Sequence, residues 1–548
     1  MKGGGATDWR RWLIGLALAA ICFVGLDRAL WTPDEPREAE ISREMARHPT
    51  TIPTLDAARF YEKPPLYYWT VAALFAMTGG ASIVAARFVS GAAGALTLLV
   101  VYLWGRRAVS PAAGGIAAWM LATSVTFFMT THWVLIDPLL MLACAVAAWG
   151  GWERLEGGGT RWLVALWGGL VVALWIKGFV GPVLVGAGLA AAAWIFRRRG
   201  AWTKLAPQAG VAAGAVAVAA LVAAIYLEGG RAALWQWGWV NHVGRFLAGE
   251  ARDHRQAVYY YAPTLAVAIV PWLVPFLDLF TRSFWAATAP ATRLRRYSAA
   301  LVGAGLLVLT ASATKRENYL LPLLPPLFLM MSLAVLDRLA RAPYPRSLAA
   351  RGWARAGEWL QAGLSAALVV VPGAAALAYV GRALPLAVAL VVVAVPLAVA
   401  LLVATAARRR RLAAGLAAVA AALFVVGGLE VSRPMLDPQK DFTPFVEALD
   451  RTLPAGAAVD AVGSDETLAG IVPFLTGRRV VDHPPDLLVA GPHPAYLLVQ
   501  QKRGHPARIP GLVEHYRPLR RFGRGRELTL WQRLAWPAPR PPEPTSRS

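Results

Sequence analysis

Charged residues and cysteines are both scarce in this sequence. Only 16% of the 548 residues are Asp, Glu, Lys or Arg, whereas a soluble domain carries roughly a quarter. The two cysteines, Cys22 and Cys144, lie inside apolar runs and match neither a metal-ligand spacing nor a disulfide framework. These shortages exclude an ordinary soluble enzyme, a zinc-binding module and a disulfide-stapled scaffold.

Apolar residues dominate instead, at 57% of the chain. Runs long enough to cross a bilayer recur along most of the sequence. The first run resembles a signal peptide but lacks a clear small-residue cleavage site, so we expect a retained first helix. The sequence therefore predicts a polytopic all-α membrane protein with about thirteen transmembrane helices. They are expected at roughly 12–30, 83–105, 112–130, 134–151, 161–176, 179–196, 207–227, 259–280, 297–313, 319–340, 357–380, 383–406 and 412–430.

The net charge of +23 does not indicate a nucleic-acid partner, because most of the excess lies in short clusters at the ends of apolar runs. If the N-terminus is cytoplasmic and the short apolar segment 65–79 lies in the outer interface, these clusters all fall on the cytoplasmic side. If 65–79 spans, they all fall outside. The positive-inside rule favours the first arrangement, in a bacterial inner membrane. The clusters are Arg106-Arg107, Arg197–Arg199, Arg293 with Arg295-Arg296, Arg338 with Arg341, and Arg408–Arg411.

This topology places the loops 31–64 and 228–258 in the periplasm, together with everything after about residue 430. Residues 431–548 change character, with short apolar stretches (AAVDAV, RRVVD, AYLLVQ) between Gly, Pro and charged turns. The sequence thus predicts a transmembrane domain over 1–430 and a small periplasmic α/β domain over 431–548. The α/β domain ends in a disordered Pro-rich tail.

The first outer loop carries the densest set of charges. Asp34 and Glu35 directly follow the first predicted helix, and Pro36 is well placed to begin a short helix. Glu62 and Lys63 end the loop. An aspartate can serve as a general base or a metal ligand, and a lysine as a point charge for phosphate. The alternative is a solvated charged helix without catalytic function, over Arg37, Glu38, Glu40, Arg43 and Glu44.

The second outer loop has a Trp-rich start and a Tyr-rich end, typical of an interfacial aromatic belt. A lone histidine in such a loop is more often structural than a ligand, but this loop shares its membrane face with Asp34, Glu62 and Lys63. Both interpretations of its polar residues stay open. These residues are His242, Arg245, Asp253, His254 and Arg255.

Charged residues at three further places lie toward the same face. Asp137 begins a helix at the outer surface, Lys177 interrupts an apolar run, and Lys315 with Arg316 sits at the outer end of its helix. Each lysine could be a snorkelling anchor. A charge inside a membrane segment is costly, however, and all three positions face the side of the polar loops. Together they indicate a site for an anionic lipid headgroup.

At DEPREAEISREM followed by EKPPLYYW, the sequence resembles the aminoarabinose transferase-like family. These are polytopic GT-C glycosyltransferases related to the protein O-mannosyltransferases. The likeness continues through LIDP, IKGFVGP, NHVGRF and KRENYLLPLLPP, and so covers nearly the whole chain. It implies an inverting enzyme that moves a sugar from a polyprenyl-phosphate carrier to lipid A or another envelope glycan, on the periplasmic side.

The resemblance also implies roles for single residues. Asp34 would be the catalytic carboxylate, and Glu35 and Asp137 would be further catalytic residues. Glu62 and His242 would hold a divalent metal such as zinc or magnesium. The donor and acceptor would be bound by Arg37, Lys63, Lys177, Arg245, Arg255 and Lys315.

Two positions depart from the family pattern. Glu38 stands where a tyrosine is frequent, and Asn241 stands where an acid often precedes the histidine. Both leave the sugar and the acceptor open, so transfer to protein Ser or Thr is retained as an alternative. A lipid-linked-sugar transporter is disfavoured, because the charges lie at one surface and no inverted repeat is visible. A non-catalytic scaffold is disfavoured further.

Overall fold

The computed structural model describes residues 8–196, 200–247, 256–286, 291–340, 348–380, 385–486, 494–502, 509–510, 512–522 and 526–534. The chain forms two compact units. The membrane unit comprises residues 1–28, 42–54 and 59–434. The sheet unit comprises residues 29–41, 55–58 and 435–548. The division predicted after residue 430 did not include the two short N-terminal segments.

Within the described residues, seven helical segments are long and apolar enough to cross a membrane. A bent pair, α5 (Pro111–Ala122) and α6 (Val125–Thr131), meets at 67° and could form an eighth span. The predicted polytopic all-α class is therefore confirmed, while the count of about thirteen spans stays a prediction. The seven are α4 (Ile83–Ala108), Gln208–Leu247 (α11, η1 and α12), α16 (Ala291–Ala311), Glu317–Ala340 (η3 and α17), Gly352–Ala378 within α18, α19 (Pro385–Ala406) and α20 (Arg410–Lys440).

Shorter helices complete the membrane unit, and each predicted apolar run contains helix. Two predicted spans are broken. The predicted span 112–130 is interrupted at Thr123 and Ser124. The hydroxyl groups of these residues donate hydrogen bonds to the backbone oxygens of Trp119 and Leu121. At 259–280 the break contains Pro271, which has no N–H to donate. The shorter helices are α1 (Asp8–Ile21), α3 (Leu66–Met77), α7 (Asp137–Leu155), α8 (Arg161–Lys177), α9 (Val180–Phe196), α10 (Ala201–Leu205), α13 (Tyr261–Ala268), α14 (Leu273–Asp278) and α15 (Arg282–Trp285).

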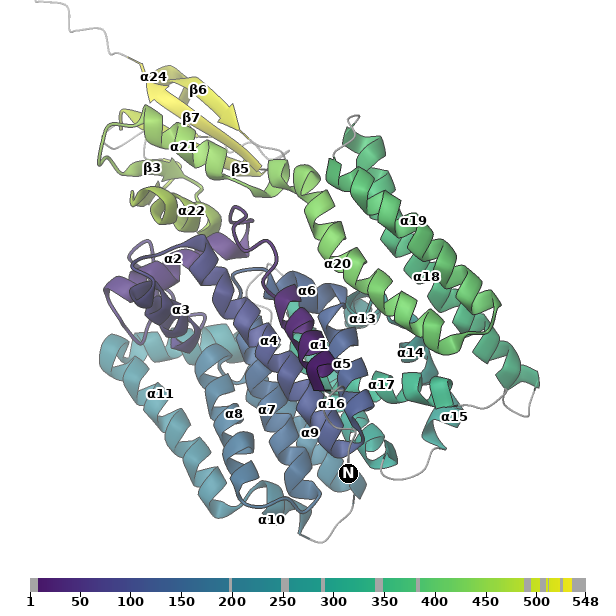
Figure 1. The fold of residues 1–548 in the computed structure, drawn as a ribbon. Helices are drawn as coiled ribbons and strands as arrows, with labels where there is room; N and C mark the ends of the chain where they lie inside the picture. The colour runs from purple at the N-terminus through teal and green to yellow at the C-terminus, as the bar shows by residue number, and fades with distance from the viewer. Residues whose placement is uncertain are drawn as a thin grey trace, which may run out of the picture. The chain divides into compact units, whose positions relative to one another are not determined.

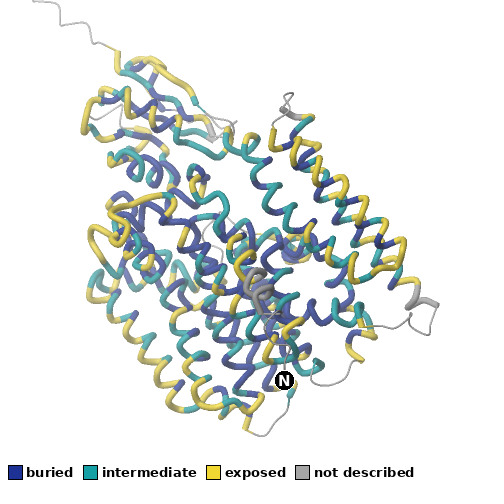
Figure 2. The backbone as a smooth tube through the Cα atoms, viewed as in Figure 1, coloured by how far each residue is buried: buried dark blue, intermediate teal, exposed yellow. Residues whose placement is uncertain are grey.

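Small residues let the central helices of the membrane unit pack closely. A Cβ at Gly114 of α5 would collide with the backbone oxygen of Tyr102 in α4, so these helices touch backbone to backbone. The outer faces are different. Val392, Val399 and Val403 of α19 are exposed, and Figure 2 shows exposed positions along α11 and α18–α20. These faces suit contact with lipid.

The sheet unit has a five-stranded sheet in the order β4-β3-β5-β7-β6. Strands β4 (Val480–His483), β3 (Val459–Val462) and β5 (Tyr496–Lys502) are parallel, whereas β7 (Arg526–Arg533) and β6 (Tyr516–Phe522) continue antiparallel. The predicted small α/β domain is confirmed, with the three predicted stretches forming β3, β4 and β5. Its helices are α21 (Thr443–Thr452), α22 (Glu466–Thr476) and α24 (Leu512–His515) (Figure 1).

The loop 31–64 contains helix α2 (Asp34–Arg47), where a short helix was predicted. Two acids in its first turn favour this start, because they complement the positive end of the helix dipole. Residues 34–41 of α2 belong to the sheet unit. There Gly470 of α22 permits close packing, since a Cβ at this position would lie 2.6 Å from the backbone nitrogen of Arg37.

Candidate active site

The charged helix α2 is buried along its first turns. Asp34 is 6% exposed, Glu35 0% and Glu38 1%. A buried carboxylate is costly unless it is paired or hydrogen-bonded. The helix is therefore not a solvated charged face, and its partners define the first part of the candidate site.

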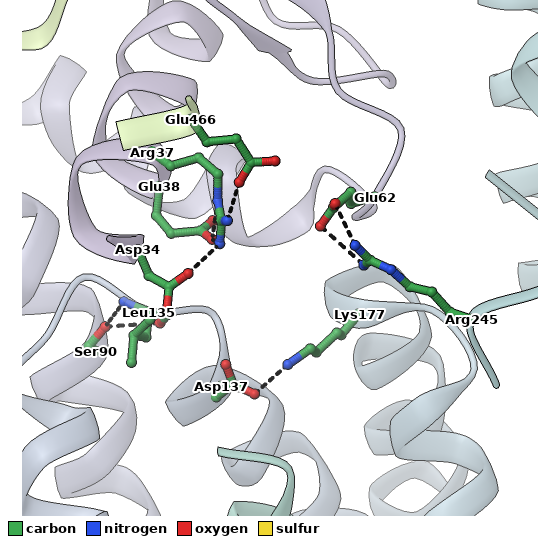
Figure 3. Close-up of polar contacts among 10 residues, drawn as sticks. All are labelled: Asp34, Arg37, Glu38, Glu62, Ser90, Leu135, Asp137, Lys177, Arg245 and Glu466. Carbon is green, nitrogen blue, oxygen red and sulfur yellow. Dashed lines mark hydrogen bonds and ion pairs between the residues drawn. The ribbon is translucent and has the colours of Figure 1, made fainter. Parts of the chain in front are cut away.

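Arg37 supplies the compensating charge in the sheet unit. Its Nη2 atom lies 2.9 Å from Asp34 and 2.7 Å from Glu38, and its Nη1 atom lies 2.5 Å from Glu466 of α22 (Figure 3). One guanidinium thus holds three carboxylates in charge-assisted hydrogen bonds. Glu38, which departs from the family pattern, gives this guanidinium its second buried acid. Asp34 is in this way fixed in orientation by Arg37.

Glu35, also predicted as catalytic, is directed at the backbone. Its carboxylate accepts a hydrogen bond of 2.7 Å from the Trp31 amide nitrogen. The Trp31 indole in turn donates to Asp437 at 2.8 Å. This geometry suits a residue that fixes the turn ahead of α2. The catalytic role of Glu35 stays a prediction.

Asp137 and Lys177 form an ion pair in the membrane unit, with Nζ 2.5 Å from the carboxylate. Asp137 begins α7 and Lys177 ends α8, so each charge lies at the helix end that stabilises it. Ser90 of α4 fixes the turn before α7, because its hydroxyl donates to the Leu135 oxygen at 3.0 Å (Figure 3). Lys177 is 13% exposed in its side chain and is held by this partner within the unit.

Tyr319 was not predicted as a site residue. The Lys177 Nζ lies 4.8 Å from the centre of its ring, within cation–π distance. Tyr319 lies in the KRENY motif, three residues after Arg316 of the basic pair that indicated a site there. An aromatic residue inside an already suspected motif was the available signal.

Glu62 and Arg245 form a two-bond pair in the membrane unit. The guanidinium donates to the two carboxylate oxygens at 2.6 and 3.2 Å. Their side chains are 22% and 30% exposed. Nearby in sequence, the Lys63 Nζ lies 5.7 Å from the centre of the Phe60 ring. Because guanidinium binds carboxylate and phosphate with the same fork geometry, Arg245 is equipped to hold a phosphate.

His242 is held by aromatic neighbours in the membrane unit. Its Nδ1 lies 2.6 Å from the Trp237 oxygen, and its ring centre lies 4.7 Å from that of Trp237. A Cβ at Gly178, whose φ is +66°, would collide with the His242 imidazole. Glycine at position 178 therefore permits the positive φ of the turn after α8. It also leaves room for the His242 ring.

The predicted divalent metal at Glu62 and His242 stays a prediction. Among the described residues, no group of three or more His, Cys, Asp and Glu side chains could hold a metal ion. Glu62 is also engaged by the Arg245 guanidinium, which repels a second cation. These residues, as the structure places them, do not fit a metal site, and no reaction step is derived through one.

Lys315, predicted to bind substrate, is bonded to backbone oxygens. It is 5% exposed, and its Nζ donates to the Ser312 oxygen at 2.6 Å and the Gln256 oxygen at 3.3 Å. It therefore joins the end of α16 to the segment that precedes η2 (Val258–Tyr260). Arg255, with Asp253 and His254, lies outside the described residues.

Comparison with known proteins agrees with these features. The model of a family described as dolichyl-phosphate-mannose-protein mannosyltransferase matches residues 26–288. The undecaprenyl phosphate-alpha-4-amino-4-deoxy-L-arabinose arabinosyl transferase of Pseudomonas paraeruginosa is 30% identical over 339 residues, 60% of this chain and 59% of that relative. The protein of the same description from Pectobacterium carotovorum is 29% identical over 340 residues, 60% of this chain and 58% of that relative. The chain thus matches under two thirds of these relatives' length.

A solved structure shares the fold across the whole chain. The crystal structure of ArnT from Cupriavidus metallidurans bound to undecaprenyl phosphate superposes with a TM-score of 0.73, at 20% identity, over 96% of this chain and 98% of that one. The chain accordingly has the fold of that structure. With the sequence matches, the predicted resemblance to the GT-C aminoarabinose transferase-like family is confirmed.

The predicted location is confirmed as well. The family likeness and the spanning helices together identify a multi-pass protein of the bacterial inner membrane. The side of the membrane that the candidate site faces rests on the charge clusters and belongs to the proposal below.

Proposed function

We propose that this chain is a glycosyltransferase that moves a sugar from a polyprenyl-phosphate carrier to lipid A or another envelope glycan, at the periplasmic face. Relatives named as undecaprenyl-phosphate aminoarabinose transferases support the donor and acceptor class. The structural observation that carries the proposal is the bidentate ion pair between the Arg245 guanidinium and the Glu62 carboxylate. It keeps a guanidinium oriented in a partly buried position, ready to exchange a carboxylate for the carrier phosphate.

The reaction breaks one bond and forms another. The acceptor oxygen attacks the anomeric carbon from the face opposite the carrier, so the configuration inverts. The bond from that carbon to the phosphate oxygen breaks, and its electron pair leaves with polyprenyl phosphate. Charge on the departing phosphate grows in the transition state, and preorganised cations stabilise it. By the resemblance, Arg245, Lys63 and Lys177 supply these cations.

Asp34 has one of two roles, according to the acceptor. A hydroxyl acceptor must lose a proton, which a buried and oriented Asp34 can take as general base. A phosphate of lipid A is already ionised, and Asp34 then orients it. In both cases Arg37 is a positioning residue, because its bonds to Asp34 and Glu38 fix the carboxylate.

A divalent metal is a separate part of the proposal, with Glu62 and His242 as its predicted ligands. If one binds, it adds positive charge near the phosphate. Its test is independent of the transfer assay. Metal analysis of the purified full-length protein decides between this prediction and the poor fit of the described residues. A stoichiometric ion that is lost in His242→Ala would support the metal. A metal-free protein with full activity would remove the metal from the account.

The function is tested by mass spectrometry of lipid A from cells lacking the gene. A sugar-sized mass increment should disappear on deletion and return with the wild-type gene but not with Asp34→Asn. Glu447→Gln is the matched control, because Glu447 is an exposed acid of α21. An unchanged lipid A profile on deletion would remove lipid A as the acceptor.

Transfer to protein Ser or Thr is the second candidate. The matching family is described as a protein mannosyltransferase, and the matched residues 26–288 include Asp34, Glu62 and Arg245. Periplasmic glycopeptides from the same strains distinguish the two. Loss of glycopeptides with unchanged lipid A would favour the protein acceptor.

A further inference from the structure

A large apolar cavity of about 490 Å³ lies in the membrane unit, among α5, α14, α17, α18, α19 and α20. Its volume falls within the ~300–1,000 Å³ typical of small-ligand pockets. Trp119 and Met120 of α5, Leu339 of α17 and Leu401 of α19 form part of its wall. None of the residues assigned to sugar transfer lines it. The cavity is therefore a second candidate site, independent of the first.

The helices around the cavity are joined by polar contacts at single points and by apolar packing. The Trp119 indole nitrogen donates to the Ala418 oxygen at 3.1 Å, which links α5 to α20. Helices α18, α19 and α20 pack through apolar clusters that include Val369, Ala398 and Leu401 (Figure 1). An apolar occupant would bury surface on both sides and join α5 to the α18–α20 group.

The cavity wall also includes several basic residues. Arg338, Arg408 and Arg410 contribute to its lining. Arg338 is paired with Asp278, with a 2.7 Å bond from Nη2, and Arg410 lies 2.7 Å from Glu358. Arg409 and Arg411 lie beside them in the sequence. Among the described residues that line the cavity there are three arginines and one acid, Glu358, so the lining carries an excess of positive charge. The positive-inside rule places these clusters at the cytoplasmic leaflet, whose lipids are partly anionic.

Gln361 adds a buried polar atom to the lining. Its amide nitrogen donates to the Pro271 oxygen at 3.0 Å and to the Ser365 hydroxyl at 3.1 Å, which fixes the orientation of the amide. Its Oε1 atom is buried and has no hydrogen-bond partner among the described residues. Such an acceptor is costly while it lacks a donor. The oxygen is closed off from solvent, so it is not counted among the contacts of a ligand in the cavity.

We propose that this cavity binds an anionic phospholipid of the inner leaflet. One acyl chain fills the apolar part, and the phosphate lies against the basic region around Arg408. Phosphatidylglycerol has this combination of acyl chain and single negative charge. The bound lipid stabilises the packing of α18–α20 against α5.

The apolar part is tested by filling the space. Gly115 of α5 lines the cavity, and a Cβ there would meet nothing within 4 Å, so Gly115→Leu occupies free volume. Gly168→Leu in α8 is the matched control, because its Cβ position is equally open and it does not line the cavity. Native mass spectrometry of the delipidated full-length protein with added phosphatidylglycerol should show one bound lipid. Gly115→Leu should lose it, and Gly168→Leu should keep it.

The charged part is tested with a pair of arginines from one turn. Arg408→Gln should weaken phosphatidylglycerol binding about fivefold. Arg411→Gln, which does not line the cavity, should change it less. Arg408 is exposed, so its variant decides the question even if Gly115→Leu does not fold. Wild-type binding in both cavity variants would overturn the proposal. Equal binding of phosphatidylethanolamine, or displacement by polyprenyl phosphate, would overturn the assignment to an anionic phospholipid.

Discussion

Helices α2 and α19 invert the rule that holds for soluble proteins. The first turns of α2 are charged, yet Asp34, Glu35 and Glu38 are buried. Helix α19 has no charged residue, yet only 28% of its most apolar window is buried inside the protein. In a bilayer the solvent is itself apolar, so an apolar face needs no protein cover. A buried charge, by contrast, needs a specific partner. Buried charges are therefore the informative residues in this chain.

The largest effect on stability is expected from replacing Arg37, which is bonded to three carboxylates. Arg37→Leu removes the guanidinium that is bonded to the buried carboxylates of Asp34 and Glu38, which costs about 3–5 kcal/mol. We expect a large fall in the thermal unfolding temperature of the detergent-purified protein and loss of lipid A modification. Arg37→Lys keeps the positive charge but loses the several donors of the guanidinium. It should therefore be more stable than Arg37→Leu and less stable than the wild-type protein. Arg451→Leu, from an exposed pair, should change neither property. Wild-type stability of Arg37→Leu would contradict the role of Arg37.

The next effect separates stability from function in the Asp137–Lys177 pair. Lys177→Met leaves a buried carboxylate and should destabilise by roughly 3 kcal/mol. Adding Asp137→Asn removes that charge and should restore most of the stability. If Lys177 binds the donor phosphate, activity stays lost in the double variant. Recovery of activity in the double variant would make the pair purely structural.

A smaller stability effect and a clear activity effect are expected at Arg245. Its pair with Glu62 is partly exposed, so Arg245→Gln should change the unfolding free energy by less than about 1 kcal/mol. The loss of a phosphate-binding fork should raise KM for the donor by about tenfold or more. The KM of Arg245→Lys should lie between those of the wild-type protein and Arg245→Gln. An unchanged KM in steady-state kinetics would exclude Arg245 from donor binding.

The smallest effect is expected on the exposed apolar face of α19. Val392 of α19 is exposed, so Val392→Ala should leave unfolding temperature and activity unchanged. Val392→Asp places a charge in contact with lipid, which costs roughly 2.5–3.5 kcal/mol at a helix centre. Its yield in the membrane should fall, as measured by quantitative immunoblotting. Normal insertion of Val392→Asp would mean that this face of α19 is not in contact with lipid.

Much of the secondary structure could be predicted, because apolar runs in a membrane chain form helices with few exceptions. Breaks were harder. Ser124 and Pro271 interrupt runs that are apolar on both sides, and hydropathy does not register them. Strands β6 and β7 were not predicted, since YRPLRRF and RELTLWQR carry many charges and only weak alternation.

The candidate residues could be predicted by type, but their partners could not. Lys177 and Asp137 are 40 residues apart, Arg245 and Glu62 183, and Arg37 and Glu466 429. Spacing reports only neighbours on one element, so such pairs leave no local signature. Lys315 differs from these residues, because the role suggested by its type is not the one that its contacts indicate. Its residue type suggested a phosphate ligand, whereas its partners are backbone carbonyls, which have no signature in the sequence.

The most direct test of the account is a transfer assay with the purified full-length protein in vesicles that contain a polyprenyl-phosphate-linked aminoarabinose donor and lipid A. The wild-type protein and the Glu447→Gln control should release free polyprenyl phosphate in an acceptor-dependent manner. Asp34→Asn should release it more slowly. If the attacking group of lipid A is a hydroxyl, Asp34 is its general base and the rate should fall by about 10²–10⁴. Release by Asp34→Asn at the wild-type rate would contradict the central role of α2, and no release by the wild-type protein would contradict this choice of substrates.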